Sequence, residues 1–176
     1  MGNQAVLTKI GRAALVKAVK ERPLFLAWGS GDPAWDTEGA EFPPLVDASA
    51  LVAEVGRRIP TLVSFATPNE NGGIVIPKGR TPSGEVQEAR YAVSESPTPY
   101  LYVQTAYSFS DAADAVIREM AVFMDSITKP DLPPGQQYFL PSEIEDSGLI
   151  LAVQIFTPAI NRSPSVRQVI DFVLPL

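Results

Sequence analysis

Short apolar runs separated by turn-forming residues are the feature that most constrains how this chain can fold. Residues 24–28 are continuously apolar, and residues 29–33, rich in glycine and ending in proline, interrupt them. The segment 69–73 contains Asn-Gly-Gly between two apolar runs, which is typical of a turn between antiparallel strands. Runs this short suit strands better than helices. The pattern therefore favours antiparallel sheet.

Reading every such run in this way yields a set of expected strands. They cover residues 24–28, 58–67, 74–76, 86–93, 100–109, 117–124, 149–156 and 166–173. Residues 77–85 and 128–148 are expected to be loops, the second of them long and rich in proline. A chain of 176 residues that is 45% hydrophobic can bury one sizeable core. We therefore expect a single α+β domain over residues 1–176, mainly antiparallel.

An amphipathic helix is predicted near the N-terminus, over residues 8–22. Thr8 is its expected N-cap, and Pro23 ends it. The apolar arc consists of Leu7, Ile10, Ala14, Leu15 and Ala18, and the opposite arc carries Lys9, Arg12, Lys17 and Lys20. We expect the apolar arc to pack on the sheet and Val16, within the basic arc, to be exposed. A second, shorter helix is predicted from Asp47 to about residue 55.

The composition excludes several kinds of chemistry. The chain has no cysteine and no histidine, so it contains no thiolate nucleophile, no Ser-His-Asp triad and no imidazole metal ligand. Carboxylate pairs could still hydrolyse glycosides. The candidates are Asp32 with Asp36, and Glu143 with Glu145 and Asp146. Acids in loops are usually solvated, so we expect no enzyme, no catalytic residue, no metal site and no cofactor.

Charge is unevenly distributed along the chain. The net charge is −6, but residues 1–22 carry five basic residues against Glu21 alone, a net of +4, which leaves −10 on the remainder. An acidic protein is poorly suited to binding phosphate backbones, so nucleic acid is not an expected partner. No apolar run is long enough to span a membrane. The basic helix face is either a solvated surface or a docking surface for an acidic neighbour, another copy of the chain included.

Two motifs resemble those of one protein family. The sequence Ile-Arg-Glu-Met-Ala-Val-Phe-Met at residues 117–124 follows an acidic, alanine-rich turn at residues 110–115. Near the start, Leu-Thr-Lys-Ile-Gly-Arg-Ala-Ala at residues 7–14 precedes the apolar run 24–28 and the pair Gly31-Asp32. Both resemble the baseplate-attachment domains of tail fibres and small structural proteins of contractile-tailed bacteriophages.

Arg118 and Glu119 are adjacent in one of these motifs. Because adjacent strand residues point to opposite faces, the two side chains should not share all their hydrogen-bond or ion-pair partners.

The resemblance implies a virion structural component, made in the host cytoplasm and built into the tail or baseplate in several symmetry-related copies. Its expected partners are tube, sheath or fibre subunits. No receptor-binding shaft follows the strand-rich region before Leu176, which favours an internal or attachment component over a whole fibre. Residues chosen as interface candidates are basic, aromatic or exposed apolar: Lys9, Arg12, Val16, Lys17, Lys20, Trp35, Tyr138, Phe139 and Leu140. The last three lie in the proline-rich loop, which we interpret as a contact loop rather than a lid over an active site.

Two other functions remain open from the sequence. One is a carbohydrate-active enzyme that uses carboxylates alone, and the other is an intracellular protein-binding module.

Overall fold

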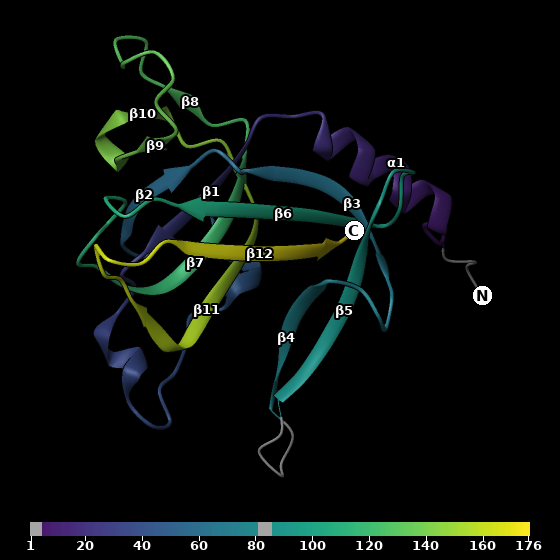
Figure 1. The fold of residues 1–176 in the computed structure, drawn as a ribbon, viewed down its shortest axis with the longest axis horizontal. Coiled ribbons are helices and arrows are strands. Elements are labelled where there is room, and N and C mark those ends of the chain that lie inside the picture. The colour runs from purple at the N-terminus through teal and green to yellow at the C-terminus, as the bar shows by residue number, and fades with distance from the viewer. Residues whose placement is uncertain (1–4, 81–85) are drawn as a thin grey trace. The chain divides into compact units, whose positions relative to one another are not determined.

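The computed structural model describes residues 5–80 and 86–176, and it confirms the expected fold class (Figure 1). Antiparallel sheets dominate, with a helix near the N-terminus. The chain divides into two compact units. Unit 1 comprises Met1–Glu21, Thr61–Gln104 and Ile170–Leu176, and unit 2 comprises Arg22–Pro60 and Thr105–Val169. One domain over residues 1–176 stays a prediction.

Unit 2 is organised around the strand that carries the Ile-Arg-Glu motif. Its sheet has the order β11-β7-β1-β2-β9, every neighbouring pair being antiparallel. These strands are β1 Leu24–Gly29, β2 Glu54–Arg58, β7 Val116–Met124, β9 Tyr138–Phe139 and β11 Leu149–Asn161. A separate short pair joins β8 Ile127–Thr128 to β10 Ile144–Asp146. Strand β7 therefore lies inside the sheet, as its uninterrupted burial from residue 117 to residue 123 requires.

Unit 1 contains most of a second sheet, of order β12-β6-β3-β5-β4. Its strands are β3 Leu62–Pro68, β4 Ile74–Arg80, β5 Val86–Ser94, β6 Tyr100–Tyr107 and β12 Gln168–Pro175. The ends of β6 and β12 belong to unit 2. A small core forms where Ala66, Ile74 and Tyr102 pack together. The expected turn at residues 69–73 is present between β3 and β4, since the amide of Gly72 donates to the carbonyl of Asn69. The pairing expected across this turn was wrong, because β3 and β4 both pair with β5, which lies between them.

Helix α1 (Lys9–Lys20) packs on strand β3 as expected, but with the opposite face. The Thr8 hydroxyl accepts a hydrogen bond from the Gly11 amide at 3.0 Å, which confirms the N-cap. Val16, expected to be exposed, is completely buried, whereas Ile10 is 83% exposed. Leu7 and Leu15 are also exposed. The ammonium group of Lys20 lies 5.4 Å from the ring centroid of Phe65, so a lysine stem helps to cover the sheet.

Several expected boundaries were wrong for identifiable reasons. The helix expected after Asp47 is absent, because the 3-10 helix η2 (Leu45–Asp47) ends there and the chain continues to β2 in an irregular path. The expected strand 58–67 is divided between β2 and β3 around Pro60, which has no amide to donate. The strand predicted at 74–76 continues to Arg80 through a register shift after Pro77. The remainder of the expected loop, residues 81–85, lies outside the described residues.

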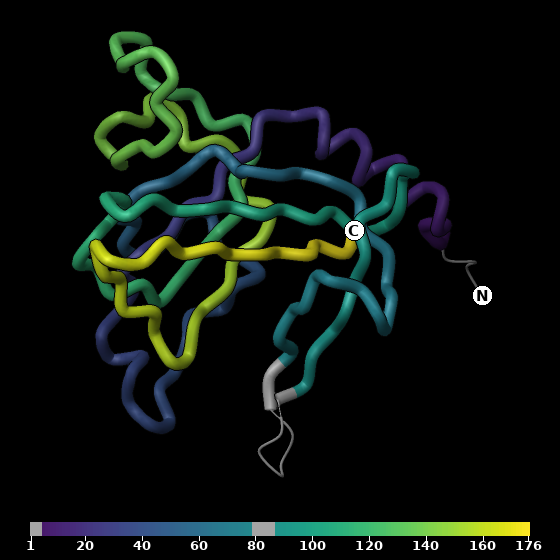
Figure 2. The backbone as a smooth tube through the Cα atoms, in the orientation of Figure 1, coloured from purple at the N-terminus to yellow at the C-terminus, as the bar shows by residue number. Residues whose placement is uncertain are grey.

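The long segment 128–148 is more ordered than its prolines suggested. It contains β9, β10 and the 3-10 helix η3 (Pro141–Glu143). In Figure 2 this segment (green), which lies between β8 and β11 in the sequence, folds back on itself. Strand β11 also continues beyond the expected residue 156, with a register irregularity between Ile155 and Ile160 that contains Pro158.

The unit 2 core predicts a large cost for truncating its central aromatic side chain. Phe123 is 1% exposed in a cluster with Phe25, Ala27 and Phe139, so Phe123→Ala should lower the free energy of unfolding by about 3 to 5 kcal/mol. Urea denaturation followed by tryptophan fluorescence measures this cost. The matched control is Phe109→Ala, since Phe109 is largely exposed, and it should cost less than about 1 kcal/mol. Equal losses in the two variants would contradict the position assigned to Phe123.

Candidate interface

Arg118 and Glu119 use separate partners, as their positions on a strand predicted. The Arg118 guanidinium donates to both carboxylate oxygens of Asp36, at 3.0 and 2.7 Å. Its remaining terminal nitrogen donates to the Ser30 carbonyl at 2.9 Å. Because a bidentate guanidinium–carboxylate pair has a defined geometry, Arg118 holds residues 30–36 against the sheet.

Glu119 binds a different loop. Its two carboxylate oxygens accept hydrogen bonds from the amides of Val52, at 3.0 Å, and Ala53, at 2.7 Å. Glu119 is almost fully buried, and the two bonds compensate for the loss of hydration. Gly29 leaves space for the Glu119 carboxylate, since a Cβ atom at this position would lie 2.5 Å from one Glu119 oxygen. The same pair of bonds occupies the amides of Val52 and Ala53, two of the amides that the helix expected from Asp47 to about residue 55 would have used.

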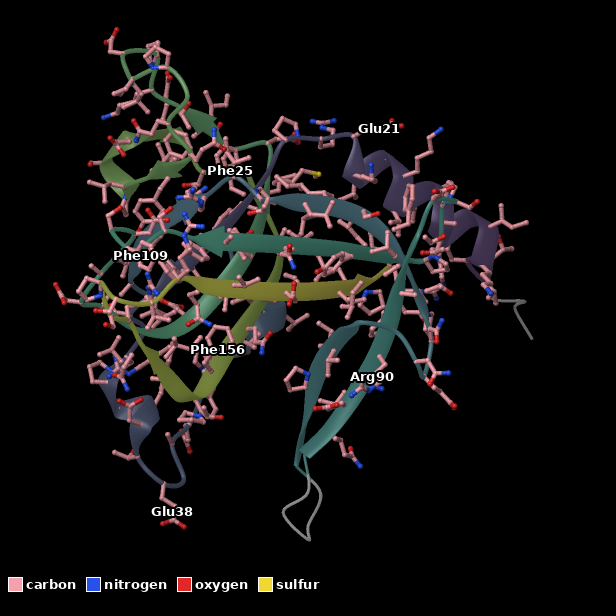
Figure 3. All side chains as sticks on the ribbon, in the orientation of Figure 1. Glu21, Phe25, Glu38, Arg90, Phe109 and Phe156 are labelled. Carbon is pink, nitrogen blue, oxygen red and sulfur yellow. The ribbon has the colours of Figure 1, made fainter. Side chains whose placement is uncertain are left out.

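These two anchors support an exposed segment, residues 36–47, which we call the arm. Asp32 caps the short helix η1 (Pro33–Asp36) before it by accepting from the Ala34 amide at 2.8 Å. Trp35 is buried beneath the arm, and its ring lies 6.0 Å from the ring of Phe42. Beyond this contact the arm is exposed, and Val46 is 91% exposed. Figure 3 shows the Glu38 side chain at the outer tip of the arm, pointing away from unit 2.

A groove of about 890 Å³ lies between the arm and the end of β11. Trp35 and Phe42 line it on the arm side, Arg118 forms part of its floor, and Pro158 lies on the β11 side. The pKa of Asp36 is lowered by its hydrogen bonds from Arg118, and the pKa of Arg118 is raised by the same bonds. Two aromatic rings beside a fixed ion pair form a surface that can bind a protein segment.

The aromatic residues of the expected contact loop belong largely to unit 2 itself. The rings of Trp28 and Tyr107 stack with centroids 3.4 Å apart, and the Trp28 indole nitrogen donates to the Tyr138 hydroxyl at 3.1 Å. Phe139 is buried and meets Phe25 edge to face. Burial raises the pKa of the Tyr107 hydroxyl well above its ordinary value. Leu140 alone of the three candidates there is largely exposed.

Unit 1 presents a second groove, which we call the helix groove. It has a volume of about 630 Å³ and is lined by Lys9, Ile10, Arg12 and Ala13 from α1, and by Thr67, Pro68, Pro97, Thr98, Pro99, Tyr100, Pro175 and Leu176. Lys9 and Arg12 are exposed at this groove. Lys17 forms an exposed ion pair with Glu21 at 4.0 Å, and Lys20 is half-buried. The basic residues therefore divide three ways: Lys9 and Arg12 lie at the groove, Lys17 lies on the outer helix surface, and Lys20 lies over Phe65.

Four of the five acids considered for catalysis accept structural hydrogen bonds, and the fifth, Glu145, is exposed. Glu143 accepts from the Leu140 amide at 2.7 Å and from the Gln136 side chain at 3.0 Å, while Asp146 accepts from the Gly148 amide at 2.9 Å. The Asp32 carboxylate accepts from the Ala34 amide, and the Asp36 carboxylate accepts from the Arg118 guanidinium. Across residues 5–80 and 86–176, no cluster of three potential metal ligands occurs. Nor do those residues form a helix long and apolar enough to cross a membrane.

Sequence reasoning missed the arm and two buried cations, Arg57 and Arg162. Phe42, Leu45 and Val46 are exposed apolar residues around Pro43-Pro44, and that proline pair next to apolar residues was the available signal. Arg57 is 1% exposed, stacks on Phe123 and donates to Glu54 and Ser126. No local pattern distinguishes this buried arginine from the arginine beside it.

A family model described as "Baseplate wedge 3 tail fiber network component" matches residues 4–176, nearly the whole chain. A comparison with curated proteins found no match.

The Glu119 anchor generates a stability prediction. Replacing the carboxylate by an amide puts an NH₂ group opposite a backbone amide, so Glu119→Gln should lower the free energy of unfolding by about 1 to 3 kcal/mol. Glu38→Gln, at the exposed tip of the arm, is the control and should change it by less than about 0.5 kcal/mol. Chemical denaturation at pH 7 measures both. A Glu119→Gln variant as stable as the control would mean that the carboxylate does not hold the loop.

The Asp36 pair generates a pH prediction. Since the pKa of Asp36 lies below its ordinary value of 3.8, the stabilisation from the ion pair is present above that value and is lost as pH falls through the folded-state pKa. Carbon-detected NMR of the Asp36 carboxyl group should show a midpoint below 3.8. In Arg118→Gln the midpoint should rise towards the ordinary value, because the main cause of the lowered pKa is removed. An unchanged midpoint in that variant would contradict the pairing.

Proposed function

Because the chain belongs to the family of baseplate wedge 3 tail fiber network components, we propose that it is a structural connector that binds neighbouring baseplate subunits through the arm. Family membership makes it a component of the phage tail baseplate and a partner of other baseplate proteins. The finer proposal is that its neighbours are tube, sheath or fibre subunits of a contractile tail. We further propose that several symmetry-related copies occur in each particle.

The observation that carries this proposal is the way unit 2 uses its polar groups. Arg118, Glu119 and Asp36 hold loops in place, while the arm exposes Phe42, Leu45 and Val46 to solvent. Placing large apolar side chains in water is unfavourable, and burying them on a partner recovers that free energy. Pro43 and Pro44 restrict the arm before it binds, which lowers the entropy lost on association. Such a surface suits a permanent subunit contact.

The family also bears on the two alternatives. A structural baseplate family favours a protein without catalytic activity over a carboxylate-only glycoside hydrolase. The local roles of Asp32, Asp36 and Glu143 agree with that preference. A binding module outside any virion would not be expected to match a baseplate family over residues 4–176.

Removing the apolar side chains of the arm should prevent incorporation into particles. In a phage that lacks this gene and is complemented from a plasmid, the double variant Phe42→Ser, Val46→Ser should be incorporated about tenfold less than the wild type, as measured by mass spectrometry of purified tails. The purified variant should remain folded with a melting temperature only slightly below that of the wild type, because Val46 is 91% exposed and Phe42, whose ring meets Trp35, is 45% exposed.

The matched control is Phe109→Ser, since Phe109 is 46% exposed and Phe42 is 45% exposed. It should be incorporated normally. Wild-type incorporation of the arm variant would contradict the proposal.

A further inference from the structure

The helix groove of unit 1 combines an apolar lining with unpaired positive charge. Ile10, Pro68 and Pro99 contribute apolar surface to it, and Ile10 is mostly exposed. Lys9 and Arg12 form no ion pair with any other residue that the structure describes. A ligand for this groove therefore needs apolar side chains between or beside negative charges.

The arm has the complementary chemistry. Its sequence Glu41-Phe42-Pro43-Pro44-Leu45-Val46-Asp47 places an apolar stretch between two acids, and every residue in it is exposed. Within the described parts of the chain, neither Glu41 nor Asp47 has an ion-pair partner. Pro44 is extended, with φ −65° and ψ 109°, and the 3-10 helix η2 (Leu45–Asp47) follows it. Proline restricts such a segment before it binds, and Tyr100 supplies an aromatic ring to the helix groove.

We propose that the arm of one copy binds in the helix groove of a second copy of the chain. Phe42 and Leu45 would contact the groove's apolar lining, while Glu41 and Asp47 would lie near Lys9 and Arg12. This inference rests on the proposed function, because it names the partner of the arm. Two different surfaces of the same chain meet in such a contact, so the copy that inserts its arm keeps its groove free and the copy that accepts it keeps its arm free. Contacts of this kind propagate into rings or open chains.

Charge selects this occupant over a symmetric pairing of like surfaces. Two helix grooves facing each other would bring Lys9 and Arg12 of both copies together, and two arms would do the same with Glu41 and Asp47. Pairing the arm with the groove opposes unlike charges, although the chain as a whole carries −6. A single arm makes a small contact, so we expect weak association between free copies that many simultaneous contacts in a particle would strengthen.

A charge exchange tests the proposal on the full chain. The groove variant is Lys9→Glu, Arg12→Glu, and the arm variant is Glu41→Lys, Asp47→Lys. Sedimentation velocity up to about 0.5 mM should show reversible association of the wild type with a Kd in the range of tens to hundreds of micromolar. Each variant alone should associate at least about tenfold more weakly, because its own arm and groove then carry like charges.

Mixing the two variants supplies the decisive measurement. The acidic groove of one variant can accept the basic arm of the other, and the reverse pairing is also complementary, so the mixture should recover association to within about threefold of the wild type. Phe42→Ser should weaken association, while Phe109→Ser, equally exposed, should not.

Each other outcome overturns the inference. A wild type that stays monomeric over this concentration range means that the arm does not bind a second copy of the chain. Association that the charge variants do not weaken, or that the mixture does not restore, means that copies meet through other surfaces. Failure here is distinguishable from failure of the proposed function. If the wild type is monomeric but the Phe42→Ser, Val46→Ser variant is lost from particles, the connector role stands and only the pairing between copies is refuted. If the mixture restores association but that variant is incorporated normally, the connector role alone is refuted.

Discussion

The opposed hydrogen bonding of Arg118 and Glu119 is the constraint on which the rest of unit 2 depends. Neighbours on a strand point to opposite faces, so one side chain binds residues 30–36 and the other binds the amides of Val52 and Ala53. A nearly buried carboxylate is tolerable only when hydrogen bonds replace its hydration. Leaving either loop unbound would therefore leave an uncompensated charge within or beside the sheet, which strongly disfavours alternative loop positions.

This arrangement explains how an acidic, histidine-free chain can act through its surface. Three ion pairs of unit 2 are used for architecture: Arg57 with Glu54, Arg58 with Asp111, and Arg118 with Asp36. What the anchored loops present outward is mainly apolar or acidic. Under the proposed function, a sheet that holds the base of an exposed arm gives a baseplate component a positioned contact surface.

Much of the fold could be predicted from local sequence, and the exceptions share a cause. The strands at 24–28, 86–93 and 117–124 were identified because apolar runs and turn residues report local conformation directly. The prediction of a helix after Asp47 was wrong, and a distant carboxylate, Glu119, accepts from two of the amides that this helix would have used, those of Val52 and Ala53. The proline-rich segment 128–148 supplies core residues, since Phe139 packs with Phe25 although they are far apart in sequence.

By itself the sequence determined the antiparallel class, the family resemblance in its two motifs and the absence of thiol and imidazole chemistry, because these depend on residue identity and short-range spacing. Only the tertiary structure decided which surfaces are available. Periodicity shows that Leu7, Ile10 and Leu15 share a helix face, but it does not show what that face meets, and a lysine stem over Phe65 covers the sheet instead. Likewise Trp35 and Phe139 are buried while Phe42 is exposed, because burial follows from the packing of distant segments and aromatic character alone does not set it.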